Sequence, residues 1–194
     1  MADAPQASGR AFLGLIRYVK EHHGADEVRR VAEAAPVETR AALAEPIAID
    51  SWYPYAAYVG LLRALDRALG QGDGAYCRLL GSVAGQRDAG TIFRVYIAVA
   101  SAERLIRSCE RIWPTYYRNA GRMVATAWSP DDTVLRIDDF PSMDPLHCRL
   151  MEGWMIATMD SIGYRVNDDA RESRCPSRGD AYHEFRCSWT PIDK

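Results

Sequence analysis

The chain has 194 residues, with 24 basic and 26 acidic side chains, a formal charge of −2 and an isoelectric point near 6.1. This length suits a single domain with a substantial core, and an apolar content of 48% is too high for a disordered chain. The near-neutral charge balance argues against an electrostatic binder of nucleic acid or membrane surfaces. No apolar run is long enough to span a membrane, and no signal peptide is recognisable, so we expect a cytoplasmic protein.

The first half of the sequence is predicted to be helical. Apolar residues at three- and four-residue spacing mark the first helix, over residues 11–21. Glycines and prolines separate it from the helices that follow. Those helices are expected over residues 26–35, 37–43, 56–69, 75–83 and 91–113. A break is expected over 85–90, and Pro114 is expected to end the last and longest helix.

The second half changes to the alternating pattern of strands. Two strands are predicted over 122–128 and 133–139, a helix follows from Pro145 to Gly163, and two more strands cover 164–175 and 180–189. We therefore predict a single α+β domain over residues 1–194. Its mainly helical part covers 10–117, and a four-stranded antiparallel sheet, built as hairpin–helix–hairpin, covers 121–190.

The last predicted hairpin brings an acid and an imidazole together. If Cys175 and Asp180 flank the turn as opposed residues, antiparallel pairing sets Glu172 across from His183. His183 shares one strand face with the apolar Phe185, Cys187 and Trp189, so it is expected to point inward. A buried acid and imidazole need polar partners, which makes this a candidate site.

Two interpretations of that site are possible, and they differ in the role of the cysteines. Their number is five, which is odd and does not suit a set of disulfides. Cys148, near the start of the preceding helix, and Cys175 could join Glu172 and His183 in a closed tetrahedral zinc site, with Cys187 as a competing sulfur ligand. The alternative is a buried Glu172–His183 pair with the cysteines as small core residues.

The last third of the chain resembles the 4-vinyl-reductase-type ligand-binding domain of bacterial sensors, which belongs with the TRAPP-like and heme-NO-binding-like folds. The matching features are the helix from Cys148 to Trp154 with its Gly153, Glu172-x-x-Cys175, Gly179-Asp180, and His183 after seven intervening residues. In zinc-bearing members a Cys takes the place of His183. The segments GRAFLGLIRYVKEHHG and RIWPTYYRNAG are also similar to a myxobacterial paralogous family of unknown function.

The resemblance implies a small apolar pocket for an aromatic or lipid-like ligand. The residues expected to line it are Phe93, Tyr96, Trp113, Trp128, Met151, Trp154 and Met155. The alternative is that these side chains are ordinary core residues. Heme is not expected, because none of the tyrosines begins the Tyr-x-Ser-x-Arg motif of the heme-NO-binding family.

The function predicted from these features is a dimeric, non-enzymatic sensory domain whose occupied pocket changes a contact with a signalling partner. Enzyme signatures such as a nucleophile elbow or a cooperating carboxylate pair are absent from the sequence. The second hypothesis is a TRAPP-like scaffolding or adaptor protein that assembles partners without a ligand.

Overall fold

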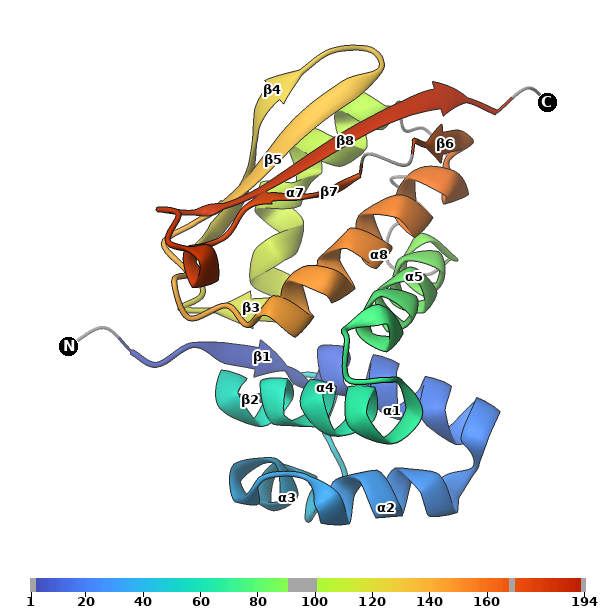
Figure 1. The fold of residues 1–194 in the computed structure, drawn as a ribbon, viewed down its shortest axis with the longest axis vertical. Coiled ribbons are helices and arrows are strands. Elements are labelled where there is room, and N and C mark those ends of the chain that lie inside the picture. Colours follow the sequence, from blue (N-terminus) through green and yellow to red (C-terminus); the bar gives the residue numbers. More distant parts are fainter. Residues whose placement is uncertain (1–2, 91–100, 168–169, 193–194) are drawn as a thin grey trace.

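A computed structural model describes residues 3–90, 101–167 and 170–192 of the chain (Figure 1). The N-terminal helices form one end of the molecule, and a sheet backed by a helix forms the other, with two long helices between them. Within the described ranges, no helix combines the length and the apolar character that crossing a membrane requires.

The N-terminal helices confirm the prediction closely. They are α1 (Gly9–His23), α2 (Ala25–Ala34), α3 (Val37–Leu43) and α4 (Tyr55–Leu69). The predicted apolar face of α1 buries Phe12, Leu15 and Val19. Gly24 adopts a φ of 88°, which lets the chain turn from α1 directly into α2.

A small sheet joins this helical end to the rest of the molecule. It consists of β1 (Gln6–Ser8), β2 (Trp52–Pro54) and β3 (Tyr117–Arg118), in the order β2-β1-β3. The sequence did not predict it, because strands of two or three residues are too short to show an alternating pattern. Pairing of β1 with β3 places the start of α1 beside the end of the helix that precedes β3.

The two long central helices are α5 (Ala75–Gly90) and α8 (Pro145–Ser161). Glycines let their backbones touch: a Cβ atom on Gly81 would lie 1.9 Å from the Leu150 carbonyl oxygen. The break predicted over 85–90 is wrong, since α5 continues to Gly90. Gly85 faces α8 instead, where its missing side chain makes room for the Trp154 carbonyl.

The helix α7 (Ala102–Tyr116) covers part of the longest predicted helix, whose residues 91–100 lie outside the described residues. The Ser101 hydroxyl caps its start by accepting a hydrogen bond from the Arg104 amide. Pro114 lies inside α7 and does not end it. The buried Trp113 indole donates to the Ala120 carbonyl at 3.0 Å, which ties the chain beyond the proline back to the helix.

The main sheet confirms the α+β class but not the predicted number of strands. In the described part of the chain it contains β4 (Arg122–Trp128), β5 (Asp132–Asp138), β8 (His183–Pro191) and β6 (Tyr164–Val166) in that order, with β7 (Arg171–Arg174) also pairing with β8. The sheet is therefore five-stranded. The predicted strand over 164–175 is divided into β6 and β7, and both pair with different parts of β8.

The predicted register of the last hairpin is also wrong. Glu172 pairs with Phe185 instead of His183, and Arg174 pairs with Glu184 across a bulge. The connection runs from the end of β7 at Arg174 to the start of β8 at His183 and contains the short 3₁₀ turn η1 (Pro176–Arg178), so it is longer than the tight turn assumed from the sequence. A bulge shifts the pairing by one residue, and alternation alone does not reveal it.

Candidate functional site

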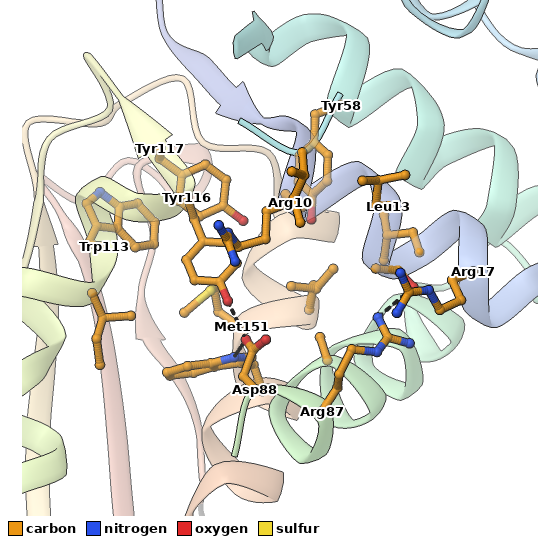
Figure 2. A pocket seen from close by; sticks show the side chains of 18 of the residues that line it. Arg10, Leu13, Arg17, Tyr58, Arg87, Asp88, Trp113, Tyr116, Tyr117 and Met151 are labelled. Atoms are coloured by element: carbon orange, nitrogen blue, oxygen red, sulfur yellow. Dashed lines mark hydrogen bonds between the residues drawn. The ribbon is translucent and has the colours of Figure 1, made fainter. Parts of the chain in front are cut away.

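A cavity of about 290 Å³ lies between α1 and the group formed by α5, α7 and α8 (Figure 2). Tyr58 of α4, Tyr117 of β3 and Met123 of β4 complete its wall. Much of the lining is apolar, including Leu13, Leu15, Ile112, Met123, Leu150 and Met151. Its volume is close to the lower end of the roughly 300–1,000 Å³ typical of small-molecule sites.

The predicted pocket residues fall into three groups. Trp113, Met151 and Trp154 line the cavity. Met155 lines a second cavity of about 20 Å³ on the sheet side of α8, and Trp128 packs on Trp189 with ring centroids 5.5 Å apart, outside both cavities. The remaining two, Phe93 and Tyr96, lie outside the described residues.

Asp88 is the buried acid of the cavity, and sequence reasoning missed it. Its Oδ2 accepts hydrogen bonds from the Tyr116 hydroxyl at 2.7 Å and the Trp154 indole at 2.9 Å (Figure 2). Burial raises the pKa of Asp88, and the two hydrogen bonds and the nearby Arg87 and Arg10 oppose that rise. A single acid in a helix carries no spacing signal, so only the tertiary contacts identify it.

Three arginines, Arg10, Arg17 and Arg87, also line the cavity. Arg87 donates a hydrogen bond to the Gly14 carbonyl at 3.1 Å, and its guanidinium points toward that of Arg17 (Figure 2). Arg10 lies 3.7 Å from the exposed Asp50 carboxylate. The cavity therefore combines an apolar interior with a cationic rim.

Beside the cavity, His147 is enclosed by aromatic rings. Its ring stacks on Trp113 at a centroid distance of 6.1 Å and lies 4.7 Å from the Tyr117 ring. The Tyr55 hydroxyl accepts from the Asp144 amide, so it donates its own hydrogen to Nδ1 of His147 at 2.9 Å. Nε2 has no hydrogen-bond partner among the described residues, and burial lowers the pKa of His147 to about 3. The imidazole is therefore held in its neutral form.

The four predicted metal ligands form a separate cluster, at the start of α8 and the end of the main sheet. The ligand atoms of Cys148, Glu172, Cys175 and His183 all lie within 4.8 Å of one another. The His183 side chain is fully buried, and its Nδ1 lies 2.8 Å from Glu172 Oε1 and 3.5 Å from Cys148 Sγ. Cys187, the competing sulfur ligand, lies outside this cluster and lines the smaller cavity.

Charge in the cluster is distributed among its members. Burial opposes ionisation of Glu172 and His183, but their mutual hydrogen bond lowers the pKa of Glu172 and raises that of His183. A hydrogen bond from the Cys148 thiol lowers the pKa of Cys175 to about 6, and the same bond, with burial, raises that of Cys148. A thiolate and a carboxylate in one buried cluster are typical donors to a divalent metal ion.

Comparison with known proteins identifies the fold. No protein-family profile matches the sequence, and no curated protein matches it. Among solved structures, an unliganded Fe(II) H-NOX protein from K. algicida is 11% identical, with 96% of this chain and 98% of that chain covered and a TM-score of 0.71. An H-NOX protein from S. oneidensis in the Fe(II)NO state is 11% identical, with 94% and 99% covered and a TM-score of 0.72.

A third similar structure comes from work on heme redox potential and protein-induced porphyrin distortion, with 10% identity, 94% and 99% coverage and a TM-score of 0.64. The chain thus has the fold of H-NOX domains, over nearly its whole length. This confirms the heme-NO-binding-like fold expected from the sequence. The finer resemblances, to the 4-vinyl-reductase type and to the myxobacterial family, stay predictions.

These structures correct one expectation. The sequence left a structural zinc ion open as one of two interpretations and led us to expect no heme, because a motif was missing. The exclusion is overturned, because the fold is shared with H-NOX proteins described in Fe(II) states and with the structure described with heme and porphyrin. The chain is only 11% identical to the H-NOX protein from K. algicida, so the lack of one sequence motif is too weak a reason to exclude heme.

The residues that line the cavity can be compared with those that a heme needs, namely partners for its carboxylates and a ligand for its iron. Its arginines suit the heme carboxylates, but the described lining contains no histidine and no cysteine to bind the iron. Burial raises the pKa values of Tyr58, Tyr116 and Tyr117, the tyrosines of the described lining, and this disfavours phenolate ligation. The remaining side chains of the lining that could bind iron are the thioethers of Met123 and Met151. The described lining of this cavity therefore does not fit a heme of the histidine-, thiolate- or phenolate-ligated kinds.

Proposed function

We propose that the chain is a small-molecule-binding sensory domain, whose ligand occupies the cavity between α1, α5, α7 and α8. The observation that carries the proposal is the cavity itself, with an apolar interior and with Asp88 and its partners fixed in the wall. Large aromatic walls with a few placed polar groups are typical of sites for small organic ligands. An aromatic or lipid-like molecule suits this lining.

The sensory part of the proposal rests on where the cavity lies. It is bounded on one side by the N-terminal helices and on the other by α5, α7 and α8, so an occupant contacts both ends of the molecule. A ligand that binds one relative arrangement of these parts more tightly shifts the population toward it. We infer that this change reaches a signalling partner, in a protein that is dimeric and without catalytic activity.

Binding of a neutral apolar fluorophore tests the cavity. We expect N-phenyl-1-naphthylamine to bind the wild-type protein with a rise in fluorescence, and Ala84→Phe, which fills the cavity from α5, to weaken binding at least tenfold. Gln86→Phe is the matched control, because Gln86 is exposed on the same helix and does not line the cavity. Equal binding by wild type and Ala84→Phe, or none by either, would contradict the proposal.

A second proposal concerns the four-residue cluster, which we infer to bind a divalent metal ion with a structural role. Bonds of about 2.0–2.3 Å in a tetrahedral site put ligand atoms about 3.3–3.8 Å apart, so a small contraction of the observed cluster suffices. Four protein ligands leave no open position for a substrate. Loss of protons from His183 and the thiols on binding makes the affinity increase with pH.

Cobalt(II) is a suitable probe, because thiolate ligation gives it intense absorption. We expect metal-free protein to bind one Co²⁺ per chain, and Cys175→Ser, which removes one of the two thiol ligands, to weaken Co²⁺ binding and reduce the thiolate band. Cys187→Ser makes the same chemical change at a buried cysteine outside the cluster and should keep the band. If Co²⁺ binds equally to Cys175→Ser, or does not bind the wild type, the cluster is a packed acid–imidazole pair with neighbouring cysteines.

A further inference from the structure

We propose that the cavity selects apolar molecules that carry one carboxylate, held at the arginine rim; this rests on the function proposed above. Among the described residues that line the cavity, three are arginines (Arg10, Arg17 and Arg87) and one is an acid (Asp88); Asp50, beside Arg10, lies outside the lining. Neutral apolar ligands need no such rim, so its composition indicates the charge of the ligand.

The arginines share one electrostatic environment with Asp88. Both Arg87 and Arg10 lower the pKa of the Asp88 carboxyl, which places their positive field inside the cavity. Asp88 already accepts two hydrogen bonds, from Tyr116 and Trp154, through the same oxygen. Asp88 and the exposed Asp50 therefore balance at most two of the three arginines of the described lining.

The rim offers geometry as well as charge. Arg17 and Arg87 come from different helices, α1 and α5, and their guanidinium groups point toward one another (Figure 2). Like charges turned toward each other favour an anion between them, and a guanidinium binds a carboxylate through two parallel hydrogen bonds. Arg87 is half-buried and is fixed by its bond to the Gly14 carbonyl, so it is ordered before a ligand arrives.

Asp88 limits the ligand to one carboxylate. A second carboxylate carried into the cavity would approach the buried Asp88 carboxyl group, and the third arginine, Arg10, already lies 3.7 Å from Asp50. Like charges at low dielectric repel strongly. The apolar interior beyond Asp88, with Met151 and Ile112, suits a hydrocarbon or aromatic body. The class of ligand is thus an apolar monocarboxylic acid.

The test compares 4-phenylbutyrate with 4-phenyl-1-butanol, which share one carbon skeleton, by calorimetric titration of the full chain. We expect the acid to bind at least tenfold more tightly, about 1.4 kcal/mol. Arg17→Gln, an exposed position that folding tolerates, and Arg87→Gln should each reduce this ratio, with thermal unfolding confirming that both variants fold. Arg67→Gln removes an exposed charge outside the cavity and should keep the ratio.

The outcomes separate this inference from the function on which it rests. Equal affinity for the acid and the alcohol overturns the charge selection and leaves an apolar ligand site. Tenfold selection that persists in both arginine variants also overturns it, because the preference then arises elsewhere. If neither compound binds, the selection is overturned, and N-phenyl-1-naphthylamine decides separately whether the cavity binds ligands at all.

Discussion

Replacing Gly81 with alanine should destabilise the protein by about 3 kcal/mol or more, although the substitution adds only one methyl group. The new Cβ would lie 1.9 Å from the Leu150 carbonyl oxygen, 2.7 Å from its carbon and 3.0 Å from its Cα. All three are backbone atoms of α8, so no side-chain rotation relieves the overlap and the helices must separate. The gap would reach Leu150 and Met151, which line the cavity.

Urea unfolding measures this effect, and thermal unfolding should show a lower midpoint by about 6–12 °C. Gln86→Ala is the control on the same helix, and because Gln86 is exposed we expect a change within about 0.5 kcal/mol. A Gly81→Ala protein within 1 kcal/mol of the wild type would mean that the two backbones are not in direct contact.

The second large effect is a dependence of stability on pH caused by His147. Its pKa in the folded protein is about 3, because burial disfavours the imidazolium, whereas an unfolded histidine titrates near pH 6.5. As the pH falls below 6.5, the unfolded chain takes up a proton that the folded protein does not. Folding stability therefore falls with falling pH, by about 1.4 kcal/mol per unit between 6.5 and 3.

The measurement compares the wild type with His147→Gln in urea unfolding at pH 7.5 and pH 5. Glutamine keeps a hydrogen-bonding side chain for Tyr55 but does not titrate. We expect the wild type to lose about 2 kcal/mol more than the variant over this interval, since 1.5 pH units lie below 6.5. Parallel losses in the two proteins would show that His147 is protonated in the folded state.

The sequence predicted the members of the four-residue cluster better than it predicted their geometry. Alternation along residues 183–189 placed His183 inward, and this holds whatever strand pairs with it. The register assigned to Glu172 was wrong, yet its long side chain still reaches His183. Inward direction is a local property, whereas register depends on a bulge and a turn that hydrophobic pattern does not reveal.

The cavity was harder to predict from the sequence than the four-residue cluster. Trp113, Met151 and Trp154 were identified because large apolar residues at helical spacing mark a buried face. Asp88 and the arginines were not, because their role depends on contacts between α1 and α5, residues more than seventy positions apart. The short strands β1, β2 and β3 were not predicted for a related reason: each is defined only by its pairing with another of the three.

The position of β8 in the sheet has a consequence for how the protein folds during synthesis. This strand, residues His183–Pro191, pairs with β5, β6 and β7, and all three precede it in the chain. On the ribosome, β6 and β7 have no partner until β8 emerges, and β5 has one of its edges open. The helical end can assemble early, from local contacts, while the sheet and the His183 cluster must wait for one late segment.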